Sequence, residues 1–261
     1  MNVSLENKTA IVCGSTQGIG LATAIELANL GATCVLMARN EIALQQAIAV
    51  LDKSFHQQHS YLVADFDQPE TVKIAIEKFI VTNAVDILIN NSGGPNSGAI
   101  TTASEDEFLN TFNRHLICNH ILAKAVIPSM KTAGFGRIIN VISTSVKIPL
   151  PNLGVSNTIR GAVASWSKTM ANELGQFNIT VNNVLPGATA TNRLKGIIEV
   201  NSDKKNKSID EIETEMKKEI PMKRFAEPNE IANAIAFLAS PAASYINGVS
   251  IAVDGGRTGT I

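Results

Sequence analysis

The sequence lacks an excess of charge of either sign, and its first residues lack the features of a targeting segment. Its 22 basic and 23 acidic residues give a net charge of −1, so electrostatics does not favour binding to nucleic acid or to an acidic membrane surface. Residues 1–6 (Met-Asn-Val-Ser-Leu-Glu) contain neither the basic nor the apolar region of a signal peptide. No membrane span is evident, so we expect a cytoplasmic protein that binds neither nucleic acid nor membrane.

Cysteine is also scarce, and Cys13, Cys34 and Cys118 are scattered along the chain. Their spacing matches no metal-ligand motif, so we predict no metal site. In a reducing compartment we expect these thiols to be buried and unpaired. Charged residues make up only 17% of the sequence and hydrophobic residues 45%, which provides enough apolar material for a sizeable core. A length of 261 residues suits one α/β sheet with an insertion.

Short apolar runs rich in β-branched residues alternate with segments of helical apolar spacing. This alternation predicts right-handed strand–helix–strand units and a parallel sheet. Residues 85–89 (Val-Asp-Ile-Leu-Ile) are apolar almost throughout, as in strands covered on both faces. We therefore predict a single α/β domain over residues 1–261, doubly wound, with a mainly parallel seven-stranded sheet in three layers. We expect strands at 9–14, 32–38, 60–65, 85–91, 136–143, 179–185 and 249–253, and helices near 18–29, 41–53, 69–82, 104–130, 154–175 and 228–239.

A glycine-rich segment, residues 13–20 (Cys-Gly-Ser-Thr-Gln-Gly-Ile-Gly), joins the first predicted strand to the first helix. In this position, Gly14 permits the turn, Gly18 lets backbone approach a phosphate, and Gly20 lets the helix pack against the strand. The helix N-terminus offers free N–H groups and partial positive charge to a pyrophosphate. The spacing G-x-x-x-G-x-G leaves a tight turn without a ligand as the alternative.

Residues after the next two strands bear on which nucleotide the chain would bind. An acidic residue after the second strand would favour NAD, but the chain has Arg39 there. Arg39 could pair with the 2′-phosphate of NADP or could be a solvated loop residue. Asp65 could accept a hydrogen bond from an adenine amino group, or could cap the helix that begins near Pro69. We predict NADP, with NAD as the less favoured cofactor.

Three further motifs complete a pattern. Residues 90–94 (Asn-Asn-Ser-Gly-Gly) end the fourth strand, Ser143 follows the fifth, and Pro186-Gly187 ends the sixth. In this order, with the glycine loop and Asp65, they resemble the short-chain dehydrogenase/reductase family over residues 5–256. The 3-oxoacyl-[acyl-carrier-protein] reductases are the nearest well-known members. The resemblance implies a Rossmann-type fold, a nicotinamide cofactor and a small-molecule carbonyl or alcohol substrate.

The resemblance also implies a homotetramer in which the helical stretches 104–130 and 154–175 pair between subunits. These stretches have apolar faces that one sheet layer would not wholly cover. The segment 183–191 resembles the part of the family that lies beside the nicotinamide, where Thr191 could reach a phosphate. The residues expected to bind the cofactor are Gly14, Ser15, Gln17, Gly18, Ile19, Gly20, Arg39, Asp65, Asn91, Ser92, Gly93, Arg160, Pro186, Gly187, Thr189 and Thr191.

The catalytic pattern of the family is broken in this chain. The family has Tyr-x-x-x-Lys on a helix, 13 residues after its serine, but this chain has Ser156 and Arg160 there. His115 stands where the family has a helix asparagine. A serine hydroxyl titrates far above the working pH, and arginine stays protonated, so neither repeats the roles of tyrosine and lysine. By sequence, neither Tyr61 nor Tyr245 is placed to substitute.

Four residues could still form a catalytic site. Ser143 and Ser156 could bind a carbonyl oxygen while Arg160 stabilises developing negative charge. His115 has a pKa suited to proton transfer, or it could fill the space of the family's asparagine. The polar segment at about 192–221 lies where the family has its substrate lid. We expect an atypical NADP-dependent oxidoreductase; the alternative is a nucleotide-binding sensor or scaffold of the same fold without redox turnover.

Overall fold

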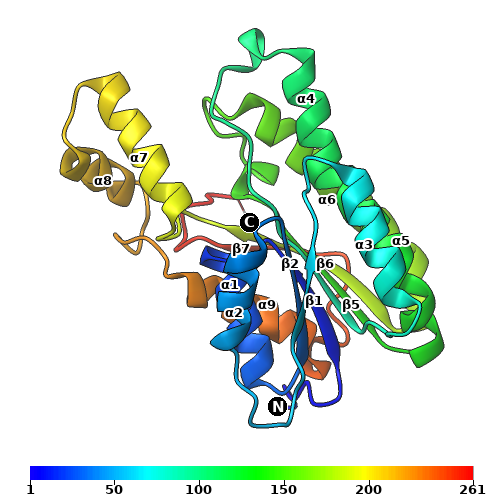
Figure 1. Ribbon diagram of the computed structural model, residues 1–261. Helices are drawn as coiled ribbons and strands as arrows, with labels where there is room; N and C mark the ends of the chain where they lie inside the picture. Colours follow the sequence, from blue (N-terminus) through cyan, green and yellow to red (C-terminus); the bar gives the residue numbers. More distant parts are fainter. Residues whose placement is uncertain (261) are drawn as a thin grey trace.

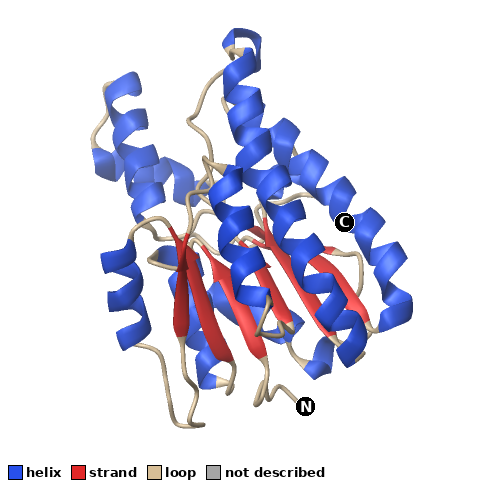
Figure 2. Cartoon of the chain, turned by 45° about the vertical axis from the view of Figure 1, so that its right-hand side comes forward, coloured by secondary structure: helices blue, strands red, loops and turns tan. Residues whose placement is uncertain are grey.

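Seven strands form a sheet through the middle of the molecule (Figure 2). In the computed structural model, which describes residues 1–260, the strand order is β3-β2-β1-β4-β5-β6-β7. Each neighbouring pair runs parallel, so the predicted sheet is confirmed. The order reverses between β1 and β4, which is where such folds bind ligands. The strands are β1 (Thr9–Cys13), β2 (Thr33–Ala38), β3 (Ser60–Val63), β4 (Ile87–Asn90), β5 (Gly136–Val141), β6 (Ile179–Pro186) and β7 (Ser250–Val253).

Helices cover both faces of this sheet and complete the three layers (Figures 1 and 2). Buried apolar side chains join each helical layer to the strands, and the three free cysteines lie within the buried interior, as predicted. Among residues 1–260, we find no helix with both the length and the apolarity needed to cross a bilayer. One layer contains α1 (Gly18–Asn29), α2 (Glu41–Ala49) and α9 (Pro228–Ala239); the other contains α3 (Pro69–Ile80), α5 (Cys118–Ala133) and α6 (Gly154–Leu174).

The predicted helix 104–130 is divided in the structure. It consists of α4 (Glu105–Phe112), a π-helical segment (Asn113–Ile117) and α5. Ser104 and Glu107 form a capping box at the start of α4, which explains the position of its N-terminus. A π turn holds an extra residue and is often found at functional sites. His115 lies in this turn and is buried there.

The segment predicted as a polar lid contains two helices, α7 (Asn192–Lys205) and α8 (Ile209–Lys218). Both stand beyond the carboxyl edge of the strands (Figure 1). Leu194 and Ile198 of α7 pack with Ile212 of α8 in a small apolar cluster. Thr191 caps α7 by accepting a hydrogen bond from the Leu194 N–H. A capping threonine before apolar residues spaced four apart was therefore a readable helix signal, which the sequence analysis missed.

Candidate active site

The glycine loop between β1 and α1 is a tight left-handed turn. Gly14 has φ of +59° and Gly18 has φ of +56°, a region that side chains disfavour. A Cβ atom on Gly20 would lie 2.1 Å from the Gly14 carbonyl oxygen, so α1 packs directly against the turn. At Gly14 and Gly20 the backbone leaves no room for a Cβ atom, and α1 starts at the carboxyl edge of the sheet.

The loop has polar groups that need a partner. Ser15 is fully buried, yet within the described chain its hydroxyl oxygen has no hydrogen-bond partner. Gln17 precedes α1, and in the structure as described its side chain accepts no hydrogen bond from the N–H groups at the start of the helix. Buried polar groups and helix N-termini of this kind are satisfied by phosphate oxygens. The residues present therefore fit the pyrophosphate of a dinucleotide.

Asparagine side chains fix the strand ends beside this loop. Asn91 Nδ2 donates to the carbonyl oxygens of residues 13 and 14, at 3.2 and 3.3 Å. Asn90 Nδ2 donates to Asn140 Oδ1 at 2.8 Å, and Asn140 Nδ2 donates to Asn183 Oδ1 at 3.0 Å. These bonds cross from β4 to β5 and β6 and hold the carboxyl edge of the sheet in one arrangement.

The start of α7 lies against the glycine loop. Asn192 Nδ2 donates to Gln17 Oε1 at 2.9 Å, and the Thr191 methyl group lies 3.2 Å from the Cβ position of Gly18. Thr189 is buried and donates to the Gly187 carbonyl oxygen at 3.0 Å. The structure thus brings the segment after Pro186 to the same place as the predicted phosphate loop, although Thr191 already uses its hydroxyl in the cap and toward Thr189.

At the other end of the predicted nucleotide site, Arg39 is 72% exposed and its Nη1 lies 3.7 Å from Asp67 Oδ2. Asp67 also accepts from Arg114 Nε and Nη2, an ion pair that the sequence analysis missed. Asp65 Oδ1 accepts from the Asp67 N–H at 3.0 Å. The proposed capping role of Asp65 is wrong, because Gln68 precedes α3 and the Asp65 carboxylate instead closes a local turn.

Ser143, Ser156 and Arg160 are positioned by β5 and α6. Ser143 follows β5, and its Oγ accepts from the Ser145 N–H at 3.1 Å. Ser156 is half-buried in the first turn of α6. Four residues further, Arg160 is only 8% exposed, and its Nη1 donates to the Val141 carbonyl oxygen at 2.9 Å. The guanidinium of Arg160 therefore reaches the end of the strand that leads to Ser143.

Of the two roles that the sequence leaves open for His115, the one that requires titration near neutral pH is contradicted. His115 is buried, and its Nδ1 shares a hydrogen bond of 2.7 Å with Ser92 Oγ. Its Nε2 is buried without a partner among the residues described. Burial, and then the charges of Arg160 and Arg114, hold the pKa of His115 well below its usual value. The imidazole is therefore neutral at physiological pH, and Ser92, expected at the cofactor, contacts this histidine.

Arg193 was not anticipated from the sequence. It lies in the first turn of α7, and its Nη2 donates to the Pro95 carbonyl oxygen. A Cβ atom at Gly94 would lie 3.8 Å from Nη2 of Arg193 and 3.8 Å from Nη2 of Arg160. Burial, and then the charge of Arg193, lowers the pKa of Arg160 to about 10. Arg160 remains protonated at neutral pH, as predicted.

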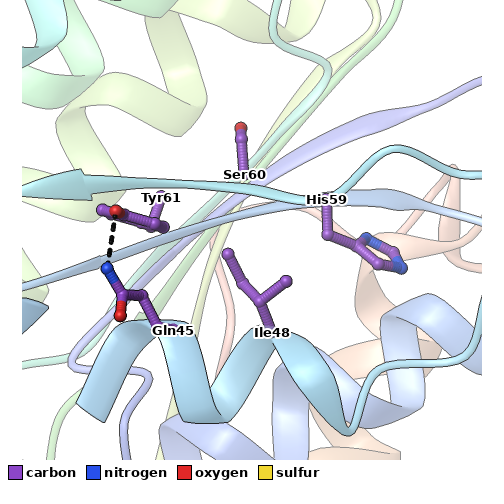
Figure 3. A pocket seen from close by; sticks show the side chains of 5 residues that line it. All are labelled: Gln45, Ile48, His59, Ser60 and Tyr61. Carbon is purple, nitrogen blue, oxygen red and sulfur yellow. Dashed lines mark hydrogen bonds between the residues drawn. The ribbon is translucent and has the colours of Figure 1, made fainter. Parts of the chain in front are cut away.

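Neither tyrosine lies near Arg160. Tyr245 is fully exposed in the connection between α9 and β7. Tyr61 lies on β3, separated from β5 by three strands. Its hydroxyl accepts from Gln45 and it lines a shallow hollow of about 410 Å³ between α2 and β3 (Figure 3). The residues lining this hollow are Gln45, Ile48, His59, Ser60 and Tyr61.

Comparison with known proteins extends over nearly the whole chain. The family model "Enoyl-(Acyl carrier protein) reductase" matches residues 14–258. The 3-oxoacyl-[acyl-carrier-protein] reductase FabG of Chlamydia trachomatis is 32% identical over 257 residues, covering 98% of this chain and 99% of the relative. The 7α-hydroxysteroid dehydrogenase of Escherichia coli K12 is 30% identical over 255 residues, covering 98% and 96%.

A solved structure is equally similar. L-Sorbose reductase from Gluconobacter frateurii, complexed with NADPH and L-sorbose, superposes with a TM-score of 0.93 at 31% identity, covering 100% of each chain. The seven-stranded fold, the order of the motifs along it and these full-length matches agree. The chain belongs to the short-chain dehydrogenase/reductase family of oxidoreductases.

Proposed function

We propose that the protein is an NADP(H)-dependent oxidoreductase that interconverts a carbonyl and an alcohol at an atypical active site. The observation that carries the proposal is the glycine loop. Its left-handed glycines, the buried Ser15 hydroxyl without a partner and the start of α1 together suit a dinucleotide pyrophosphate. When bound, NADPH supplies the hydride. Asn91 maintains the loop in this shape by its hydrogen bonds to residues 13 and 14.

Arg39 selects NADP over NAD. Its guanidinium is exposed at the end of β2, and its pair with Asp67 is long and solvated, so a doubly charged 2′-phosphate can displace it. No acidic residue takes the place of Arg39 directly after β2 to bind a ribose diol. The similar L-sorbose reductase was solved with NADPH, which supports this choice.

The groups that meet the substrate come from β5 and α6. Ser143 and Ser156 hydroxyls donate hydrogen bonds to the carbonyl oxygen; Ser143 is oriented for this because its oxygen already accepts from the Ser145 N–H. The buried guanidinium of Arg160 stabilises negative charge that develops on that oxygen. Water supplies the proton, because Arg160 is a poor acid and His115 is neutral. His115 maintains the position of Ser92.

Helices α7 and α8 act as the substrate lid of a single domain. The contacts of Asn192 with Gln17 and of Arg193 with Pro95 join α7 to the nucleotide loop and to the 91–98 loop. Both contacts are made by exposed side chains at the start of α7. The lid can therefore open by breaking a few surface hydrogen bonds, while Leu194, Ile198 and Ile212 keep α7 and α8 together.

A second function, nucleotide binding without redox turnover, is favoured by one observation. Of the two tyrosines, neither lies near Arg160, and the one histidine beside it is neutral. A protein with this site could sense a nucleotide or hold a partner without reducing a substrate.

Fluorescence titration with NADPH and NADH, followed by a panel of ketones, ketoesters and oxo acids at high enzyme concentration, tests the two functions. We expect NADPH to bind more tightly than NADH and to be oxidised slowly by a member of the panel. NADPH binding without turnover of any carbonyl compound would favour the second function. Absence of nucleotide binding would refute both.

A further inference from the structure

Two guanidinium groups from different elements meet at one point of the 91–98 loop. Arg160 comes from α6 and Arg193 from α7. Their Nη2 atoms each lie 3.8 Å from the position that a Cβ atom on Gly94 would occupy. The Nη2 atoms of the two arginines can therefore lie no further from each other than twice that distance. A single carboxylate, which accepts on both oxygens, can bridge two donors at such a separation.

Neither guanidinium has a counter-ion in the described part of the chain, where no carboxylate oxygen lies within 4.0 Å of Arg160 or Arg193. Arg160 is almost completely buried, and its Nε has no hydrogen-bond partner among residues 1–260. A buried charge without an opposite charge is strongly unfavourable, and a like charge beside it adds to the cost. An anion bound between the two side chains would remove both penalties.

The other arginines of the chain do not show this arrangement. Arg137 is buried too, but it donates to the carbonyl oxygens of Gly136, Asn178 and Ser240 and lies over the Phe135 ring. The remaining four arginines, Arg39, Arg114, Arg224 and Arg257, each pair with a carboxylate. Arg160 and Arg193 are therefore the exception among the described residues, and they occur at the candidate active site.

We propose that Arg160 and Arg193 together bind a carboxylate of the substrate, so that the substrate is an oxo acid or a hydroxy acid. The inference rests on the proposed function, because it assigns the anion to the molecule that is oxidised or reduced. The Arg160 guanidinium donates to the Val141 carbonyl oxygen at the end of β5. β5 is the neighbour of β4, and β4 is the neighbour of β1, which leads to the phosphate loop. Arg193 belongs to the lid, so binding of the carboxylate also draws α7 toward the 91–98 loop.

Calorimetric titration with oxamate tests this proposal without requiring turnover. Oxamate has a carboxylate beside a carbonyl group and accepts no hydride, and ethyl oxamate is its uncharged counterpart. Both are titrated into the protein with and without saturating NADP⁺. We expect oxamate to bind in both conditions and ethyl oxamate to bind in neither. Arg193→Gln and Arg160→Gln should each weaken oxamate binding about tenfold or more, and Arg193→Lys should restore part of the loss.

Lys195→Gln is the matched control, because it removes an exposed positive charge from the same helix and should leave oxamate binding unchanged. The affinity for NADP⁺ is measured in parallel and should change less than about twofold in Arg193→Gln. Two results together would overturn the proposal: oxamate binding disappears at saturating NADP⁺, and Arg193→Gln has a reduced affinity for NADP⁺. They would assign the arginine pair to the diphosphate of the cofactor. Equal oxamate binding by all variants, or none by wild type, would also overturn the proposal. If wild type binds oxamate but does not bind NADP⁺, the proposed function would be refuted instead.

Discussion

At the scale of single residues, we propose that Arg39 determines the preference between two nicotinamide nucleotides. Its only ion pair among the described residues, with Asp67, spans 3.7 Å and is exposed, so its charge is available to a ligand. We expect Arg39→Ala to weaken NADPH binding about tenfold or more and NADH binding very little. Fluorescence titrations of both nucleotides measure the ratio. Lys73→Ala, at an exposed lysine of α3, is the control, and equal loss for both nucleotides would contradict the assignment.

In the proposed function, Ser156 and Arg160 limit how fast a neutral carbonyl compound can be reduced. We predict slow reduction of a simple ketoester by wild type, because no side chain beside Arg160 is a suitable acid. Ser156→Tyr combined with Arg160→Lys should raise the rate of NADPH oxidation more than either single change. Tyrosine without a lysine keeps a high pKa, so the two changes are coupled. Rapid reduction by wild type that Ser156→Ala abolishes would disprove this description of the site.

His115 links the site to the pH dependence of stability. Its pKa is lowered in the folded state by burial and by the charges of Arg160 and Arg114. The unfolded chain therefore binds a proton below about pH 6.5 that the folded chain does not, and stability falls as the pH falls through this value. The free energy of unfolding is measured with urea at pH 7.5 and at pH 5. We expect it to decrease less between these pH values in His115→Asn than in wild type. An identical loss in both proteins would show that other groups cause the pH dependence.

At the scale of elements, apolar spacing in the sequence predicted most helices and strands, but it did not predict where their irregular ends lie. Predicted strands continued to Asp65, Asn91 and Ser143, whereas the strands end before these residues, which leave the sheet as loops at its carboxyl edge. The π turn around His115 was not predicted, because one extra residue shifts the apolar pattern by a single position, and such a shift is hard to recognise in one sequence. In the folded protein, the histidine in this turn is buried and hydrogen-bonded to Ser92.

The parts of the candidate site that could not be predicted from the sequence depend on long-range contacts. The glycine loop is local, so residues 13–20 alone predicted a tight turn that leads into a helix, and the structure adds that its glycines are left-handed. Arg193 gained its significance only from its approach to Gly94 and Arg160, far away in the chain. Asp67 likewise meets Arg114 only in the folded protein. Charged residues in loops and first turns give no periodic signal, so such partnerships require the structure.

The start of α7 provides a prediction at this scale. Thr191 caps the helix by accepting from the Leu194 N–H, so Thr191→Ala should destabilise the first turn of α7 by about 1 kcal/mol. Hydrogen exchange of the α7 amides should then be faster, with the amides of α1 unchanged. Ser208→Ala, which removes the cap of α8, is the matched control and should accelerate exchange in α8. Unchanged exchange throughout α7 in Thr191→Ala would show that the Asn192–Gln17 contact alone fixes the helix start.

At the scale of the whole molecule, the outer faces of α5 and α6 bear on how copies of the chain associate. Their large apolar side chains are buried or half-buried within one chain. The half-buried ones include Ile121, Ile127 and Trp166, which pack at the edge of one core cluster. His120 and Trp166 contact each other edge to face, so the two helices are adjacent there. A second copy covering this surface would complete the burial of these side chains.

We predict that the protein is a homotetramer in which these helices pair between subunits. Ser165 is exposed on α6, so Ser165→Arg should be tolerated within one chain but should place two arginines together across a symmetric interface. We expect wild type to scatter light as a tetramer at micromolar concentration and Ser165→Arg to scatter as a smaller species. Gln46→Arg, an exposed position on α2, is the control and should leave the mass unchanged. A monomeric wild type would refute the prediction, whereas a tetramer that survives Ser165→Arg would move the interface to another face.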